Sequence, residues 1–214
     1  KTFVLDKDEI VNVAPRIFKG TSDILRKEPS FSNIELISEK RAKYWVDGAK
    51  ELKKDFPNKI IVGSIMAAYN KQDWLDLAKM CVDAQFDVVE LNLSCNHGMP
   101  DKGMGRACSD VPEVVEDIVR TVCSVYKGPV FVKLSPNSTI TEQITASTLK
   151  AGGKGVSATN TMFSFMDPEP NMDPYPAVGP KKETYFGGAC GSILRPIALR
   201  VATNINNHPE LKAA

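Results

Sequence analysis

The sequence predicts an α/β fold built on a parallel β-sheet, because short apolar runs alternate with helical patterns along the chain. Strand-like apolar runs occur at 60–65, 88–93, 130–134 and 155–159, with an earlier one near 2–5. Apolar residues recur at helical spacing in the segments 39–56, 70–81, 111–125 and 140–151. Units of roughly 25–40 residues that alternate in this way are typical of parallel sheets with crossover helices.

The helical segments carry start and stop signals. The apolar stripe in 39–56 ends before Pro57, and the segment 70–81 opens on Asn70, a residue type that caps helix starts. Pro112 stands in the first turn of 111–125, where its missing N–H costs no helical hydrogen bond. Gly152 and Gly153 stop the segment 140–151. We therefore expect a helix at each of the four segments.

The number of strands leaves two architectures open. A complete (β/α)₈ TIM barrel takes about 250 residues, whereas this chain has 214. The alternatives are a short doubly wound sheet and a (β/α)₈ barrel that is incomplete at both ends. We expect one domain over 1–214, with an active-site loop at 97–105 and a long loop at 162–192, where no apolar period is present. A loop of that length in a compact domain is usually functional.

Composition and charge argue against several classes of function. The chain has 27 basic and 26 acidic residues, so its net charge of +1 gives no footprint for nucleic acid or an anionic membrane. No apolar run reaches the roughly 20 residues of a membrane span. The five cysteines form no CxxC pair, and His97 and His208 lie far apart, which argues against a disulfide framework or a metal site. The odd number of cysteines favours a reducing compartment, and no secretory signal pattern opens the chain, so we expect a cytoplasmic protein.

Polar residues gather where three predicted strands end. Side chains alternate along 88–94, so Glu90, Asn92 and Ser94 share one face and the apolar residues share the other. Lys133 comes late in the strand 130–134, and Asn160 follows the strand 155–159. Each residue alone is commonly a turn or cap residue. Because α/β proteins bind ligands at the carboxyl ends of their strands, the whole set predicts a ligand site there.

Cys95 and Lys133 suggest the chemistry of this site. Cys95 is ordinarily interpreted as a core thiol, but it follows Ser94 directly and precedes the glycine-rich loop 97–105, whose closure would exclude water. A thiol with an ordinary pKa of about 8.5 is protonated at pH 7 and can donate a proton. For Lys133 the alternatives are an ion pair with Glu90 and a cation beside a reduced flavin ring. No G-x-G-x-x-G motif supports a nicotinamide site.

Several motifs in order along the chain resemble a known family. The sequences ELNLSC at 90–95, HGM at 97–99, ATNT at 158–161, GGACG at 187–191 and RPIALR at 195–200 resemble the dihydroorotate dehydrogenase-like FMN barrels. NIELISEK at 33–40, SIM at 64–66 and YPAVG at 175–179 are similar to the dihydropyrimidine dehydrogenase branch of that family. The resemblance runs from residue 1 to about residue 207.

The resemblance implies a role for each matched position. Cys95 falls on the catalytic acid. The positions that fall on pyrimidine-binding residues are Asn33, Glu35, Asn92, Leu93, Ser94, Asn160 and Thr161. The positions that fall on FMN contacts are Lys1, Thr2, Lys133 and Gly191. No metal ligand is implied.

The reaction implied by the resemblance is the NADPH-dependent reduction of the 5,6-double bond of uracil or thymine, the first step of pyrimidine catabolism. Reduced FMN passes a hydride to C6 while the thiol of Cys95 protonates C5. The resemblance also implies FAD, NADPH and 4Fe–4S clusters in further domains, and a homodimer for the full-length protein.

The chain departs from the family pattern in two respects. Asn96 replaces the proline that usually follows the catalytic cysteine, which leaves the loop less rigid. The family's first strand, its last two strands and its phosphate-binding segment have no counterpart, so we expect the isolated chain to be inactive and to hold FMN weakly. The competing interpretations are a dihydroorotate dehydrogenase, in which Pro-Asn usually follows the cysteine, and a non-catalytic fragment of a barrel.

Overall fold

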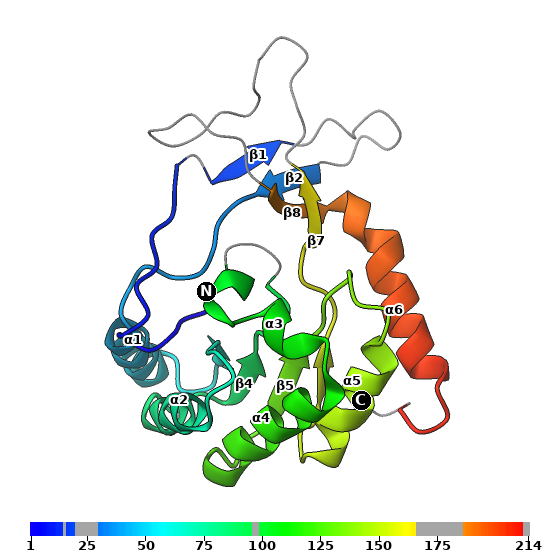
Figure 1. Ribbon diagram of the computed structural model, residues 1–214. Helices are drawn as coiled ribbons and strands as arrows, with labels where there is room; N and C mark the ends of the chain where they lie inside the picture. Colours follow the sequence, from blue (N-terminus) through cyan, green and yellow to red (C-terminus); the bar gives the residue numbers. More distant parts are fainter. Residues whose placement is uncertain (15, 20–29, 96–98, 166–185, 212–214) are drawn as a thin grey trace.

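The central sheet is parallel, as the alternation of strands and helices predicts. The computed structural model describes residues 1–14, 16–19, 30–95, 99–165 and 186–211. Its central strands are β3 (Val62–Ile65), β4 (Val88–Leu91), β5 (Val130–Lys133) and β6 (Gly155–Ser157), which pair in that order (Figure 1). Each lies within a predicted strand and is slightly shorter than predicted.

The four predicted helices are also present. They are α1 (Ala42–Asp55), α2 (Lys71–Asp83), α4 (Pro112–Val125) and α5 (Thr141–Lys150). The Oδ1 atom of Asn70 caps α2 by accepting from the backbone N–H groups of Gln72 at 3.0 Å and Asp73 at 3.3 Å. Pro112 opens α4 as expected.

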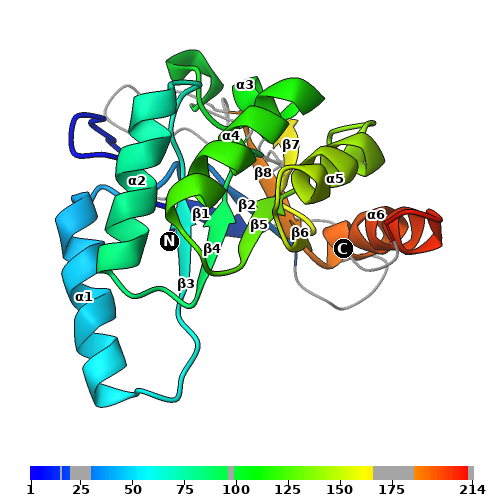
Figure 2. The ribbon, with the colours of Figure 1, turned by 90° about the horizontal axis from the view of Figure 1, so that it is seen from below.

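One face of the central sheet carries the main core. Val89, Leu91 and Leu93 are fully buried in a cluster that includes Trp74 from α2 and Ile118 from α4. Figure 2 shows α2, α4 and α5 along one side of the central strands. Because side chains alternate along β4, Glu90 and Asn92 point to the opposite face, away from these helices. The polar residues of the strands are thereby gathered on the inner side of the curved sheet.

The strand expected near 2–5 is reduced to a single parallel bridge between Phe3 and Ile65. The backbone N–H of Phe3 donates to the carbonyl of Ser64 at 3.1 Å, and the N–H of Met66 donates to the carbonyl of Phe3 at 3.1 Å. The chain then turns, with a hydrogen bond from the N–H of Asp8 to the carbonyl of Leu5 at 3.0 Å. This early turn is the reason why the pairing with β3 stops after one residue.

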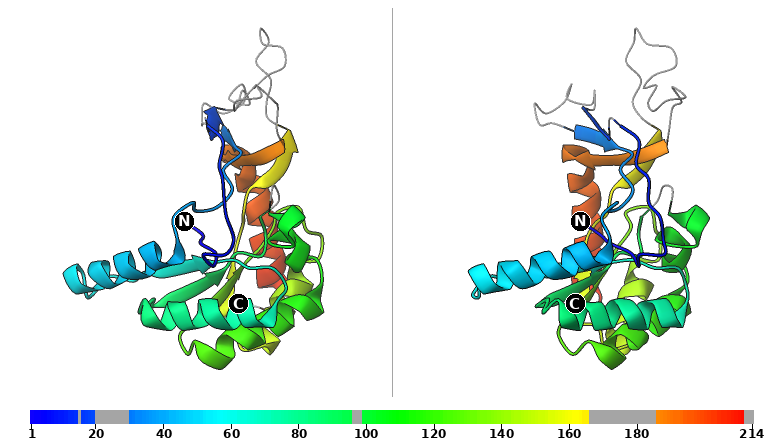
Figure 3. Two further views of the ribbon diagram at one scale, coloured as in Figure 1. Left: turned by 60° about the vertical axis from the view of Figure 1, so that its left-hand side comes forward. Right: turned by 90° about the vertical axis from the view of Figure 1, so that its left-hand side faces the viewer.

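A second, antiparallel sheet was not predicted. It has the order β1 (Ile17–Lys19), β2 (Ser30–Asn33), β8 (Phe186–Gly191) and β7 (Met162–Phe165). The segment 162–192, expected to be a loop, is therefore strand at both ends, while 166–185 lies outside the described residues. The glycines of β8 hide its strand character, because they supply main-chain hydrogen bonds without an apolar period. Figure 3 shows this sheet standing over the end of the central sheet.

Shorter elements complete the described chain. The loop predicted at 97–105 holds the 3₁₀ turn η2 (Pro100–Lys102), and α3 (Arg106–Ser109) follows it, whereas 96–98 lie outside the described residues. After β8, the turn η3 (Ser192–Leu194) leads into α6 (Arg195–Asn207), which packs against α5. Within the described ranges, none of the helices has the length and apolarity that crossing a membrane requires.

Two glycines should respond to alanine substitution in opposite ways. Gly105 has a φ of +58°, and a Cβ there would lie 2.7 Å from the carbonyl oxygen of Cys95. Gly105→Ala should therefore lower the free energy of unfolding by about 1–3 kcal/mol. Gly48 lies within α1, and a Cβ there would meet nothing within 4 Å. Gly48→Ala should raise the free energy of unfolding by roughly 0.5–1 kcal/mol. Urea denaturation measures both changes in the free energy of unfolding. Equal effects of the two substitutions would contradict the strained backbone and close contact described at Gly105.

Candidate active site

Amide and hydroxyl side chains from separate strands meet at the carboxyl end of the central sheet. The Nδ2 atom of Asn160, which follows β6, donates to Oδ1 of Asn92 at 3.2 Å and to Oγ of Ser94 at 3.1 Å. The Nδ2 atom of Asn92 donates in turn to Oγ1 of Thr2 at 2.9 Å. Asn92 and Ser94 are buried. The structure thus brings together four of the residues singled out from the sequence.

Asn160 and Thr161 are held from two sides. The backbone N–H of Asn160 donates to the carbonyl of Leu134 at 2.9 Å, and Oδ1 of Asn160 accepts from the N–H of Thr161 at 2.8 Å. The side chain of Thr161 packs against Gly188 in β8, closely enough that a Cβ at Gly188 would collide with it. Thr161 therefore lies where the central sheet meets the antiparallel sheet. Leu93, the predicted site residue between Asn92 and Ser94, is buried in the main core.

Lys133 faces Glu90 on the inner side of the sheet. Its Nζ atom lies 3.5 Å from Oε1 of Glu90, so the ion pair considered as one interpretation is present. Glu90 also accepts from Oγ of Ser64 at 3.1 Å and from Oγ of Ser157 at 2.7 Å. The lysine side chain keeps 31% of its surface exposed, so the ion pair leaves part of it accessible. The ion pair and a role toward a ligand are thus compatible.

Cys95 is buried, with 7% of its surface exposed, and packs in a small cluster that includes Met66, Met99 and Met104. Its carbonyl accepts from the N–H of Arg106 at 2.9 Å, which folds the loop 99–105 back over it. The five cysteines are all within the described residues, and none forms a disulfide.

Two of the other cysteines are core residues, as expected for unpaired thiols. Burial raises the pKa of Cys81 to about 12 and that of Cys108 to about 11, so neither is a reactive thiolate at neutral pH.

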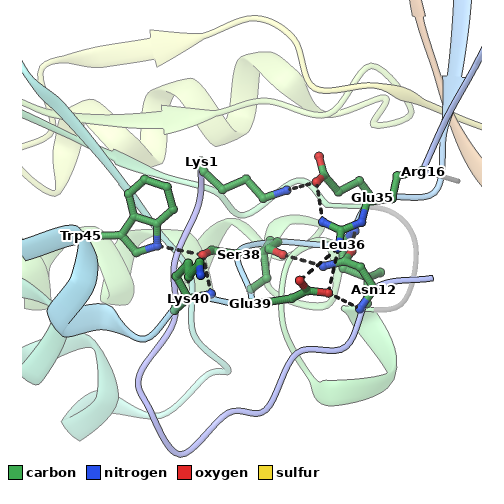
Figure 4. Close-up of polar contacts among 10 residues, drawn as sticks. Lys1, Asn12, Arg16, Glu35, Leu36, Ser38, Glu39, Lys40 and Trp45 are labelled. Carbon is green, nitrogen blue, oxygen red and sulfur yellow. Dashed lines mark hydrogen bonds and ion pairs between the residues drawn. The ribbon is translucent and has the colours of Figure 1, made fainter. Parts of the chain in front are cut away.

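Among the described residues, two cations hold Glu35 (Figure 4). Its Oε1 atom lies 2.8 Å from Nζ of Lys1 and 3.2 Å from Nη1 of Arg16. Burial opposes the charge, but the hydrogen bonds from Lys1 and Arg16 outweigh it and lower the pKa of Glu35. Glu35 is therefore an ionised acceptor at neutral pH. Sequence reasoning missed Arg16, because no periodic pattern links it to a residue 19 positions further on.

Arg16 is itself fixed by a wider set of contacts. Its Nη2 atom lies 3.0 Å from Oε2 of Glu39, and Oε1 of Glu39 accepts from the backbone N–H of Asn12 at 2.8 Å. Oδ1 of Asn12 accepts from the N–H of Leu36 at 2.8 Å. Figure 4 shows these side chains converging on the segment 35–40. The segment that carries Glu35 is thus fastened to the chain before β1.

Asn33 and Gly191 belong to the antiparallel sheet. The Nδ2 atom of Asn33 donates to the carbonyl of Gly188 at 3.1 Å, and Gly191 pairs with Ser30 and has a φ of +87°. Asn33, Glu35 and Cys190 line an open hollow of about 430 Å³. Lys1 binds Glu35 while the adjacent Thr2 binds Asn92. These two residues therefore connect the predicted site residues near the antiparallel sheet to those at the end of the central sheet.

Comparison with known proteins identifies the family. The family described as dihydroorotate dehydrogenase matches residues 7–212. The chain is 33% identical to the chloroplastic dihydropyrimidine dehydrogenase (NADP⁺) of Arabidopsis thaliana, over 96% of this chain and 49% of that protein. It is 32% identical to the NAD-dependent dihydropyrimidine dehydrogenase subunit PreA of Escherichia coli K12, over 85% of this chain and 44% of that protein.

More distant relatives support the same fold. The catalytic subunit of dihydroorotate dehydrogenase B from Alkaliphilus metalliredigens is 31% identical over 73% of this chain and 50% of that protein. The crystal structure of a ligand-free dihydroorotate dehydrogenase from Eimeria tenella superimposes with a TM-score of 0.66 at 18% identity, over 96% of this chain and 60% of that one.

These matches decide between the two predicted architectures in favour of the incomplete (β/α)₈ barrel. The chain spans about half the length of the curated relatives that it matches. The predicted resemblance to the dihydropyrimidine dehydrogenase branch is confirmed by the relatives that cover most of the chain. The chain belongs to the dihydroorotate dehydrogenase family.

Proposed function

We propose that the chain is part of a dihydropyrimidine dehydrogenase and forms the site where FMN reduces uracil or thymine. The observation that carries the proposal is the convergence of Asn92, Ser94 and Asn160 at the strand end that leads directly into the buried Cys95. The relatives that cover most of the chain bear the name of that enzyme. Electrons would come from NADPH through FAD and 4Fe–4S clusters held by other domains.

The side chains suit the polar edge of a pyrimidine ring. Uracil and thymine present carbonyl acceptors and N–H donors in alternation, and the amides of Asn33, Asn92 and Asn160 supply both kinds of partner. Glu35 supplies acceptors alone, and Lys1 and Arg16 keep it ionised. Such a set rejects analogues that leave a buried polar group unpaired. Leu93, Ser94 and Thr161 complete the proposed pyrimidine-binding residues.

The residues expected to hold FMN fit such a group. Lys133 presents a partly exposed ammonium, and Oγ1 of Thr159 is buried with no hydrogen-bond partner in the described part of the chain. A ligand oxygen or nitrogen would satisfy this hydroxyl, which sequence reasoning did not single out. Lys1, Thr2, Lys133 and Gly191 are the proposed FMN contacts. Reduced FMN, when bound, supplies a hydride for C6 of the ring.

Cys95 completes the reduction by donating its thiol proton to C5. Hydride and proton together add two hydrogens across the 5,6-double bond and leave a thiolate, which takes a proton from solvent before the next turnover. Cys95 packs against Met99 and Met104, which shield its side chain from water. We place the protein in the cytoplasm, as a homodimer in its full-length form.

The isolated chain should hold FMN weakly and be inactive. Among the described strands, β6 pairs with β5 alone, and β3 has one further bridge besides its pairing with β4. Both ends of the central sheet are therefore open where a complete barrel would close them. The following experiments accordingly use a form of the protein that carries the complete barrel.

Dihydroorotate dehydrogenase activity is the second candidate, because its catalytic subunit from Alkaliphilus metalliredigens matches 73% of the chain at 31% identity. The fold and FMN chemistry would be the same, and orotate would be the pyrimidine. The ionised carboxylate of Glu35 favours uracil, since it already pairs with Lys1 and Arg16, the nearby cations that could otherwise bind the carboxylate of orotate.

Replacing Cys95 should abolish most of the turnover but not cofactor binding. Cys95→Ala should leave FMN bound and slow pyrimidine reduction by about 10²–10⁴-fold, the usual contribution of general acid catalysis. Cys123→Ala, on the outer helix α4, is the matched control and should keep normal turnover. Single-turnover kinetics with reduced enzyme measures both variants. If Cys95→Ala matched the control, the thiol would not be the acid.

Removing Arg16 should raise the pKa of Glu35. Arg16→Met deletes one of the two cations that pair with the carboxylate in the described part of the chain, whereas Arg106→Met breaks the distant pair with Asp110 and serves as control. A carboxyl-detected NMR titration measures the Glu35 pKa in each protein. Because the folded pKa of Glu35 is lowered, the stabilisation is present above the unfolded pKa and is lost as pH falls through the folded pKa. The stability difference between wild type and Arg16→Met should shrink accordingly in acid. An unchanged Glu35 pKa would contradict the role of Arg16.

A further inference from the structure

We propose that Glu90 is a positioning residue that holds the two halves of the site in register: it fixes the Lys133 ammonium and sets the orientation of the Asn92 amide. The inference rests on the proposed function, in which Lys133 faces the flavin and Asn92 faces the pyrimidine. Glu90 is neither the proposed catalytic acid nor one of the proposed pyrimidine or FMN contacts.

Glu90 collects contacts from three other strands. It lies in β4 and accepts from Ser64 in β3 at 3.1 Å and from Ser157 in β6 at 2.7 Å, and its Oε1 atom lies 3.5 Å from Nζ of Lys133 in β5. β6 is not a neighbour of β4 in the sheet, so the contact with Ser157 crosses the inside of the curved sheet. A carboxylate in a buried parallel strand is costly unless it is paired. These three partners meet that requirement at a side chain that is 17% exposed.

A chain of hydrogen bonds runs from Glu90 through Ser64 and Thr2 to Asn92, and the donor and acceptor of each bond are fixed. An ionised carboxylate only accepts hydrogen bonds, so the single hydroxyl proton of Ser64 is donated to Glu90. The 2.9 Å hydrogen bond between Ser64 and Thr2 then requires Thr2 to donate. Thr2 has its oxygen left to accept from Nδ2 of Asn92, at 2.9 Å. This order turns Oδ1 of Asn92 toward Asn160, which donates to it at 3.2 Å.

The charge of Glu90 thus has two separate consequences. It compensates the ammonium of Lys133 and thereby limits the positive potential that this lysine exerts on a flavin. It also dictates which end of the Asn92 amide faces the proposed substrate. A neutral amide in its place would remove the first effect. Because an amide both donates and accepts, donors and acceptors could also exchange along the hydrogen-bond relay from residue 90 through Ser64 and Thr2 to Asn92.

The test compares Glu90→Gln, which keeps the shape and removes the charge, with Glu116→Gln. Glu116 also carries a lysine partner, Lys150 at 2.9 Å, but lies on the outer helix α4. In the FMN-loaded protein, Glu90→Gln should shift the flavin reduction potential upward, whereas Lys133→Met should shift it downward. Uracil affinity, measured by flavin absorbance, should fall in Glu90→Gln by about threefold to tenfold, the effect of one lost hydrogen bond. Glu116→Gln should change neither quantity.

A second variant separates the two effects and guards against misfolding. Ser64→Ala breaks the relay but leaves both charges, so it should weaken uracil binding by a similar factor without the upward shift in potential. The side-chain amide signals of Asn92, recorded by NMR without FMN, should move in Glu90→Gln and Ser64→Ala and stay in place in Glu116→Gln. The proposal is supported if the flavin reduction potential shifts upward in Glu90→Gln and downward in Lys133→Met while uracil affinity falls in Glu90→Gln and Ser64→Ala. The expected changes in the Asn92 amide signals support it on their own.

Failure of this inference is distinguishable from failure of the proposed function. A wild-type protein with a complete barrel that binds no FMN contradicts the proposed function, while the amide signals still decide whether Glu90 orients Asn92. If Glu90→Gln leaves potential, uracil affinity and amide signals as in wild type, Glu90 has no positioning role, whatever the protein's activity.

Discussion

The alternation of side chains along β4 is the constraint on which the rest of the structure depends. Its apolar residues, Val89 and Leu91, enter the core beneath the helices, and this burial fixes the register of the strand. Glu90 and Asn92 then have to point into the curved inner face, where neighbouring strands must supply their partners. A slip of one residue would bury a carboxylate among the helices. The helix packing and the polar site are thus two results of the same register.

Residues 1 and 2 join this inner face to the antiparallel sheet. Lys1 pairs with Glu35, and Thr2 lies between Ser64 and Asn92, so the two groups of polar residues are tied at adjacent positions of one short segment. Thr161 makes a second junction through its contact with Gly188. The carboxylate after β2 and the amides after β4 and β6 are therefore linked through main-chain and side-chain contacts. A ligand between them would be bound by both sheets.

The regular half of the fold was predictable from the sequence, and the irregular half was not. The central strands and helices follow from apolar periods and from caps such as Asn70, because burial against one face leaves a local pattern. The meeting of Asn92, Ser94 and Asn160 follows from the rule that parallel strands share a carboxyl edge. The antiparallel sheet escaped prediction, since Gly187 and Gly188 pair through the main chain and leave no pattern. Arg16 escaped it because its partners, Glu35 and Glu39, are distant in the chain.

The discrimination between uracil and orotate tests the central claim most directly. The site presents amides and an ionised Glu35 that occupies the cations Lys1 and Arg16, a set that matches a ring with N–H donors better than a ligand with its own carboxylate. The measurement is an anaerobic titration of the FMN-loaded protein with each pyrimidine, followed by flavin absorbance. We predict that uracil perturbs the flavin spectrum at concentrations where orotate has no effect. A spectrum that responds to orotate and not to uracil would contradict the account.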